Sequence, residues 1–172
     1  MPTPDQLHQR VASLTAHFER VQRERMAGIP MLNPALSVAA VGFEWAATEP
    51  GTLAMAEGVL ITPWFMNLIR LPADVLPHQN RVGRKSVRDF GGERFDFIGA
   101  HDPAVGYHET CALFSPMQGF DSQARALETA REVLALTRAQ PDAPKPAPEP
   151  AAARASMPSR RAFFTPGRSA TR

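Results

Sequence analysis

The sequence has few of the residues and motifs from which enzymes commonly build their sites. It contains one cysteine, Cys111, among 172 residues. A single cysteine excludes an internal disulfide, and it excludes a cage of thiolate metal ligands within one chain. There is no phosphate-binding loop, dinucleotide fingerprint or Gly-x-Ser-x-Gly elbow. These absences favour a binding protein over an enzyme.

A long apolar run is also missing. The most apolar window, residues 53–71, is interrupted by Glu57, Gly58, Pro63 and Arg70, which makes it too broken for a membrane span. The first residues lead straight into a polar helical pattern, without the apolar stretch of a signal peptide. We therefore expect a soluble, cytoplasmic protein.

Proline is abundant but unevenly placed. Six of the 17 prolines fall in residues 141–158, where large apolar residues are almost absent. Such a segment cannot offset its ordering entropy by burial. We predict one domain over residues 1–139 and, over residues 140–172, a disordered Pro/Ala-rich linker with a basic tail. The tail carries a net charge of +4 and the domain −2, which argues against a nucleic-acid-binding domain.

The two ends of the predicted domain have helical periodicity. Leu7, Val11, Leu14, Phe18 and Val21 recur at spacings of three and four, as on one face of an amphipathic helix. Thr3 can cap this helix, with Pro4 at its first position. A second helix is predicted over residues 122–138, capped by Asp121 or Ser122.

The region between the helices has the alternation of β-strands. Runs are predicted at 38–47, 52–62, 66–71, 93–101 and 107–115, and residues 48–51 suit a type II turn. Glu57 falls on an apolar face, and we expect a bulge beside Gly58 to turn its carboxylate outward. The pattern predicts an α+β fold: an antiparallel sheet of about five strands with the N-terminal and C-terminal helices packed on one face.

Residues 72–92 are predicted to be a long connection. This segment carries four cations, Arg81, Arg84, Lys85 and Arg88. A loop of that length in a compact domain is often functional. A solvated helical turn with exposed charges is the alternative.

Candidate catalytic groups are sparse. His8 and His17 are predicted to lie on the polar side of the first helix. His101, Asp102 and His108 flank one hairpin turn and form a candidate metal site, although two histidines without a third placed ligand are a weak indication. We expect no metal and no cofactor.

The lone thiol has one candidate base. His108 precedes Cys111 by three positions, so on a regular strand the two side chains point to opposite faces and cannot activate the thiol. A small metal- or thiol-dependent accessory enzyme that uses His101, His108 or Cys111 remains the alternative function.

The segment Pro63-Trp64-Phe65-Met66 places two aromatic rings and a flexible thioether beside a chain break. Trp and Met are enriched at protein-binding surfaces. We predict that Trp64, Phe65 and Met66 belong to a partner-binding site. The alternative is that the two rings are core residues under the helices.

Several segments resemble the HybE-type [NiFe]-hydrogenase assembly chaperones. They are Gly58-Val59-Leu60-Ile61-Thr62-Pro63-Trp64-Phe65-Met66, Leu71-Pro72, Phe95-Asp96-Phe97, residues 107–117 with Cys111-Ala112-Leu113-Phe114-Ser115-Pro116-Met117, and Ser159-Arg160-Arg161-Ala162-Phe163-Phe164 to Gly167-Arg168. Order and spacing match over most of residues 5–138, and Ile61-Thr62-Pro63-Trp64 is the most specific segment.

The resemblance implies a cytoplasmic accessory protein that holds precursor subunits of a [NiFe]-hydrogenase until their metal centres are complete. It also implies that premature export of the small subunit by the twin-arginine route is prevented. A rubredoxin accompanies some members, and because Cys111 is unpaired, any rubredoxin here must be a separate protein.

The tail contains two arginines followed closely by aromatic residues: Arg160, Arg161, Phe163 and Phe164. This pattern looks like a twin-arginine export motif, but no apolar segment follows it. A merely basic, solubilising end is one explanation. The other is mimicry, in which the tail occupies the signal-binding surface and a flexible linker gives it a high effective concentration.

Mimicry predicts that a twin-arginine signal peptide binds more tightly to a chain that ends at Met157 than to the full chain. Replacing Arg160→Ala together with Arg161→Ala should have the same effect. Titration of a labelled signal peptide measures the difference. Unchanged affinity would reject mimicry, and weaker binding would make the tail part of the site.

Overall fold

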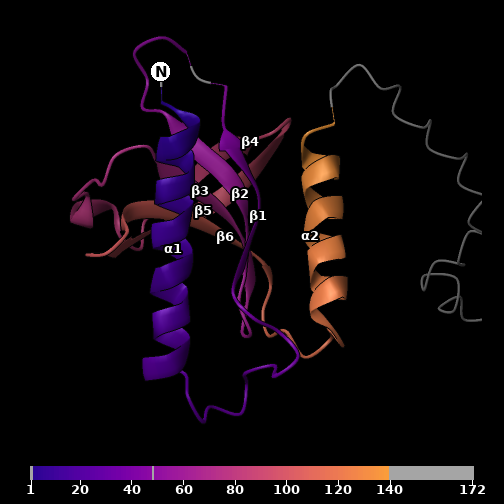
Figure 1. Cartoon of the computed structure of the whole chain (residues 1–172). Coiled ribbons are helices and arrows are strands. Elements are labelled where there is room, and N and C mark those ends of the chain that lie inside the picture. Colours follow the sequence, from indigo (N-terminus) through magenta and orange to yellow (C-terminus); the bar gives the residue numbers. More distant parts are fainter. Residues whose placement is uncertain (1, 48, 140–172) are drawn as a thin grey trace, which may run out of the picture. The chain divides into compact units, whose positions relative to one another are not determined.

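The computed structural model describes residues 2–47 and 49–139 (Figure 1). The expected tail, residues 140–172, lies outside the described residues. The elements in chain order are α1 (Pro4–Glu24), β1 (Ala39–Trp45), β2 (Met55–Ile61), β3 (Met66–Pro72), the 3₁₀ turn η1 (Gln79–Arg81), β4 (Lys85–Phe90), β5 (Glu93–Asp102), β6 (Gly106–Phe114) and α2 (Gln123–Thr137). Within this part of the chain, neither helix has the length and apolar character to cross a membrane.

Both helices begin at the predicted caps. The Thr3 hydroxyl accepts a hydrogen bond from the Gln6 amide at 3.1 Å, and Pro4 follows it in the first turn. The Ser122 hydroxyl accepts one from the Arg125 amide at 3.2 Å. Each bond satisfies a backbone donor that has no partner within the helix. The two helix assignments are therefore confirmed together with their starting positions.

The six strands form one antiparallel sheet in the order β1-β2-β3-β6-β5-β4. The α+β class is confirmed, with one strand more than the five expected. The extra strand, β4, lies inside residues 72–92, where a connection was predicted. The expected turn forms one residue later than predicted, at residues 49–52: Gly51 has a φ of +86°, and the Thr52 amide donates to the Glu49 carbonyl at 3.1 Å.

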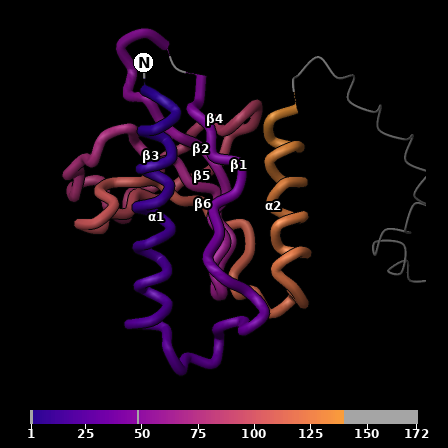
Figure 2. The backbone as a smooth tube through the Cα atoms, viewed as in Figure 1, coloured from indigo at the N-terminus to yellow at the C-terminus, as the bar shows by residue number. Residues whose placement is uncertain are grey.

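The helices pack on opposite faces of the sheet, and the expectation that they share one face was wrong. Figures 1 and 2 show α1 on one side of the strands and α2 on the other. The burial agrees, because Leu14 of α1 packs with Leu60 and Leu134 of α2 packs with Val59. Neighbouring residues of a strand point to opposite faces, so β2 contributes to two separate cores.

The buried residues fall into two clusters, one under each helix. The cluster under α2 comprises Leu36, Val41, Val59, Ile61, Met66, Leu68, Phe90, Phe97, Met117, Ala126, Ala130 and Leu134. The cluster under α1 comprises Leu14, Ala56, Leu60, Ile69, Leu71 and Val105. All seven residues of β2 are buried, as expected for a strand covered on both faces.

The predicted bulge beside Gly58 is on the neighbouring strand instead. Glu57 and Gly58 pair regularly with Arg70 and Ile69, while the register of β1 against β2 shifts between Val41 and Glu44. Gly58 is required for a different reason, because a Cβ atom there would collide with the ring of Phe43. The Glu57 carboxylate therefore stays on the α2 face and is buried rather than turned outward.

We predict that Leu14→Ala and Leu134→Ala each destabilise the domain by about 3 kcal/mol, because each leaves a cavity under one helix. Since the two cavities lie on opposite faces of the sheet, their costs should add in the double variant. Chemical denaturation of the three variants measures this. A double-variant cost far from the sum would contradict two independent cores.

Candidate partner-binding surfaces

The turn between β2 and β3 is held by one buried threonine. The Thr62 hydroxyl accepts hydrogen bonds from the amides of Trp64, at 3.3 Å, and Phe65, at 2.9 Å. It donates to the Phe65 carbonyl at 3.1 Å, and the Thr62 amide donates to the same oxygen at 2.8 Å. Thr62 has no exposed surface. The two aromatic residues are therefore mounted on a rigid backbone.

Three aromatic rings meet at this turn, and we call Phe18, Trp64 and Phe65 the aromatic corner. The centroids of Phe18 and Phe65 are 5.5 Å apart, and those of Trp64 and Phe65 are 5.6 Å apart, both edge to face. All three side chains are half-buried. Edge-to-face contacts restrict the motion of the rings while part of each ring stays exposed. The corner therefore presents a rigid apolar surface to solvent.

Met66 does not belong to this surface. It is fully buried under α2, where it joins the core with Leu68 and Met117. Its expected role as a partner-binding residue is therefore wrong in this conformation. Met66 is the first residue of β3 and points to the α2 face, whereas Phe18 and Phe65 pack against the cluster under α1 on the other face.

Asn33 ties three loops together at the same end of the sheet. Its amide nitrogen donates to the carbonyls of Met117, at 2.9 Å, and Phe120, at 2.7 Å. Its backbone amide donates to the Pro63 carbonyl at 2.9 Å. Because Asn33 is buried, leaving these groups without partners would be costly. Asn33 therefore holds three segments in place: the loop before β1, the turn carrying Trp64 and the segment before α2.

Further apolar side chains are exposed around these tied loops. Met31 is 42% exposed and Phe114 is 40% exposed. The Met31 carbonyl accepts a hydrogen bond from the Gln118 side chain at 2.8 Å, and Phe114 pairs across the sheet with Met66. Clustered exposed apolar residues mark interaction surfaces more strongly than scattered ones. The aromatic corner is thus part of a wider apolar end of the domain.

A second surface lies on the α2 face beyond the helix, where charged groups replace the apolar core. The Arg70 guanidinium contacts the carboxylates of Glu57, at 2.9 Å, and Glu109, at 2.6 Å. Arg88 contacts Glu109 at 2.9 Å, and the Tyr107 hydroxyl donates to the same carboxylate at 3.1 Å. We call these five residues the ion-pair cluster. Its members come from β2, β3, β4 and β6, so it holds together four of the six strands.

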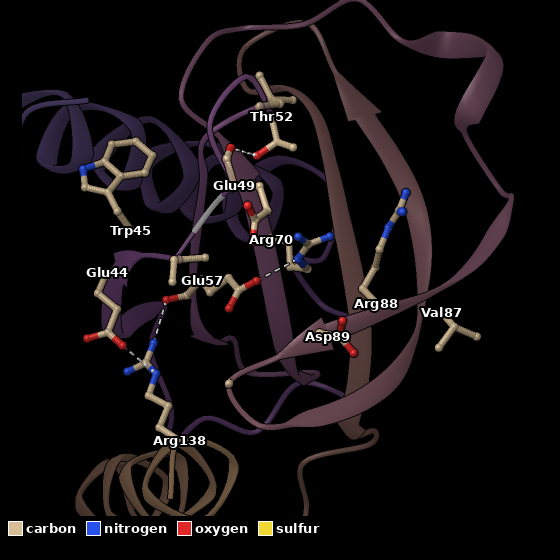
Figure 3. A pocket seen from close by; sticks show the side chains of 14 residues that line it. Glu44, Trp45, Glu49, Thr52, Glu57, Arg70, Val87, Arg88, Asp89 and Arg138 are labelled. Carbon is tan, nitrogen blue, oxygen red and sulfur yellow. Dashed lines mark hydrogen bonds and ion pairs between the residues drawn. The ribbon is translucent and has the colours of Figure 1, made fainter. Parts of the chain in front are cut away.

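A cleft of about 480 Å³ opens above this cluster. Figure 3 shows Glu57 and Arg70 at its floor and Arg88 to one side. At the opposite wall Arg138 contacts the Glu44 carboxylate at 2.9 Å, and it donates to the Glu57 carbonyl at the same distance. Two exposed carboxylates, Glu49 and Asp89, also line the cleft, so its lining combines paired and solvent-exposed charges.

The charges of the cluster shift the ionisation of Glu109. Burial opposes its ionised form, but hydrogen bonds and positive charge from Arg88 and Arg70 outweigh this, and the pKa of Glu109 lies below its ordinary value. For Tyr107, burial and the neighbouring Glu109 charge raise the pKa. Both groups are thus fixed in one protonation state at neutral pH, as suits a structural network.

Sequence reasoning missed this cluster. Glu57 was noticed on an apolar face but assigned to the outside, and Glu109 was not singled out. The sequence contained a signal, because strict alternation along residues 52–62 places the Glu57 carboxylate on the apolar face of the strand. Its partner Arg70 is 13 positions away on the next strand, and only the register of the sheet brings the two together.

The family model described as "[NiFe]-hydrogenase assembly, chaperone, HybE" matches residues 9–166. The chain belongs to this family. It is 48% identical to "Protein HoxT" of Cupriavidus necator over 147 residues, which cover 80% of each chain. It is 43% identical over 160 residues to "Hydrogenase expression/formation protein HoxT" of Azotobacter vinelandii, covering 92% of this chain and 95% of the relative.

A solved structure has the same fold. The solution structure of HybE from Escherichia coli matches with a TM-score of 0.54 at 21% identity, covering 94% of this chain and 91% of that one. At this identity the likeness concerns the fold alone. The suspected HybE-type family and the α+β fold are confirmed.

The residues of the alternative enzyme hypothesis do not converge in this HybE-family chain. On β5, His101 and Asp102 are neighbours and face opposite sides of the sheet. His108 on β6 pairs with Ala100 of β5, so it shares a face with Asp102 and lies on the opposite face from His101. Among residues 2–47 and 49–139, no group of three His, Cys, Asp or Glu side chains is placed to hold a metal ion.

The thiol and the remaining histidine are packed into different cores. Cys111 packs against the cluster under α2, and burial raises the pKa of its thiol. His108 is buried, and burial lowers the pKa of its ring. His17 is also buried, 3.2 Å from the Asp102 carboxylate, so its predicted solvated position was wrong. The predicted tail residues Arg160, Arg161, Phe163 and Phe164 lie outside the described residues.

The ion-pair cluster gives a prediction for stability. Glu109→Gln leaves Arg70 and Arg88 without their shared carboxylate, and it should cost about 3 kcal/mol at neutral pH. A carboxyl with a lowered pKa stabilises the fold above its ordinary pKa, and this contribution is lost as the pH falls through the lowered value. The variant should therefore lose less stability on acidification than the parent chain.

Thermal or chemical unfolding at neutral and acidic pH measures both effects. Glu128→Gln is the matched control, since Glu128 forms an exposed pair with Arg125 on α2 and should cost less than about 1 kcal/mol. Equal costs for the two variants would show that the cluster does not stabilise the sheet.

Proposed function

We propose that this chain binds precursor subunits of a [NiFe]-hydrogenase during their maturation and delays export until the metal centres are inserted. In this proposal it acts in the cytoplasm, without a cofactor and without catalysing a reaction. Membership of the assembly-chaperone family supports the general role. The observation that carries the binding role is the aromatic corner: Trp64 and Phe65 on a turn fixed by Thr62, packed against Phe18 of α1.

The physical properties of the corner suit a binding anchor. Aromatic residues dominate the residues that cost most when truncated at protein interfaces. Ordering flexible side chains at an interface also costs conformational entropy, and this weakens binding. Here the rings already contact one another, and their backbone is hydrogen-bonded through Thr62, so little order remains to be imposed. The exposed Met31 and Phe114 extend the apolar area available to a partner.

The partners follow from the same reasoning. The main partner is a precursor subunit, and a twin-arginine signal peptide is the segment proposed for recognition. Residues 1–139 carry a net charge of −2, which favours approach of a basic signal sequence. We include Arg160, Arg161, Phe163 and Phe164 of the tail in the proposed recognition surface. Any rubredoxin involved is a separate protein.

The test is capture of a hydrogenase precursor subunit by the tagged full chain and by Trp64→Ala and Phe65→Ala variants. Removal of an anchor ring should weaken binding by about 2 kcal/mol, or roughly thirtyfold. In cells, the same variants should release the precursor for export before its metal centres are complete. Leu136→Ala is the matched control, since Leu136 is 73% exposed on α2.

Circular dichroism and melting curves establish that each variant is folded. Trp64→Phe keeps an aromatic ring and should retain most of the binding. If folded Trp64→Ala and Phe65→Ala chains capture the precursor as well as the Leu136→Ala chain does, both rings are scaffold and the proposed site is wrong.

A further inference from the structure

Four cations, which we call the basic row, lie close together in the chain: Arg81 and Arg84 precede the edge strand β4, and Lys85 and Arg88 belong to it. Arg81, Arg84 and Lys85 are exposed, and the Arg88 side chain is 38% exposed. Within the described residues, Arg88 alone of the four has an ion-pair partner, Glu109. Unpaired like charges repel one another, so their concentration in eight positions requires an explanation that the aromatic corner does not provide.

The backbone that carries these cations is firmly held. The Gly83 amide donates to the Gly99 carbonyl at 2.8 Å, and the Gly99 amide donates to the Arg84 carbonyl at 3.1 Å. Gly99 is required for this approach, because a Cβ atom there would collide with the carbonyl of Arg81. The exposed charges are thus presented from a fixed position along β5 and not from a loose loop.

β4 is also the free edge of the sheet. It is the last strand in the order β1-β2-β3-β6-β5-β4, whereas the other edge strand, β1, is contacted by both helices. Among the described residues, backbone hydrogen bonds from positions 85–90 run to β5 alone. The outer N–H and C=O groups of β4 therefore remain open to an added strand.

Two small cavities lie between the row and the ion-pair cluster. Each has a volume of about 180 Å³, and Arg81, Arg88 and Tyr107 line both. Their size suits single side chains. The charge beside them is strongly positive, because Glu109 is already paired with Arg70 and Arg88.

We infer that β4 and the cations at positions 81, 84, 85 and 88 bind an extended, acidic polypeptide segment as an additional strand. Lys85 and Arg88 are three residues apart on β4 and point to opposite faces, so cations flank the edge on both sides. Charges distributed in this way over positions 81–88 match carboxylates spaced along a chain better than they match one phosphate group. Single-stranded nucleic acid would need exposed rings for stacking, and Tyr107 is only 4% exposed. This surface is separate from the aromatic corner and does not depend on the identity of the partner bound there.

The test uses the full chain and a labelled synthetic peptide of about ten residues in which glutamate alternates with threonine, a length typical of one strand. Fluorescence anisotropy gives its dissociation constant at low and physiological salt. Arg81→Glu with Arg84→Glu should weaken binding at least about tenfold, since it reverses two of the charges that face the peptide. Arg23→Glu with Arg131→Glu changes the net charge equally on the exposed faces of the two helices and should leave binding unchanged.

Two further peptides separate the contribution of charge from that of backbone strand pairing. A lysine-for-glutamate peptide should not bind. A glutamate peptide with alternate amides N-methylated should bind more weakly, because it cannot complete the strand pairing. Trp64→Ala should leave all of these affinities unchanged, which distinguishes this surface from the proposed precursor site.

Three outcomes would overturn the inference. The first is acidic-peptide binding that survives the charge reversal or is indifferent to N-methylation. The second is tighter, charge-dependent binding of single-stranded DNA. The third is self-association of the charge-reversed chain without any change in peptide affinity, which would mean that the cations only protect the free edge from aggregation.

Discussion

The fold depends on one constraint, the complete burial of β2. This strand has apolar neighbours on both faces, because α1 covers one side and α2 the other. Each helix buries its apolar face against a different set of β2 side chains. The sheet is therefore shared between two cores, and the loops at its ends are free to carry surface features.

Local signals explain what could be predicted from the sequence. The caps Thr3 and Ser122 and the turn containing Gly51 depend on residues close to one another in the chain. The placement of the helices on opposite faces depends on distant packing. A signal for it was present, since residues 55–61 form a nearly continuous apolar run, which is typical of a strand buried on both faces.

The missed strand β4 and the missed ion-pair cluster have a common physical cause. An edge strand needs to bury few side chains, and only Phe90 of β4 is buried, so the alternation there was too weak to recognise. Glu57, Arg70 and Glu109 are polar residues whose burial becomes favourable only when the register brings them together. The aromatic corner was found because Trp64 and Phe65 are adjacent in the chain, although Phe18 was recognised only as part of a helix face.

The two surfaces make different demands on the scaffold. The aromatic corner is mounted on a turn whose hydrogen bonds are internal, through Thr62, and whose neighbours are tied by Asn33. The basic row is mounted on a segment that lies against β5 at Gly99. The third ring of the corner, Phe18, comes from α1, so this helix completes the corner as well as closing its own core.

The two-sided core has a consequence for motion. Because α1 and α2 have no common cluster of buried residues, either helix can open transiently while the other core stays closed. Such local openings would expose one face of the sheet at a time, at a fraction of the free energy of global unfolding. The β2 amides are protected from both sides, so they would exchange with solvent only when the whole domain unfolds. Amides near the helix ends would exchange through independent local openings of lower free energy.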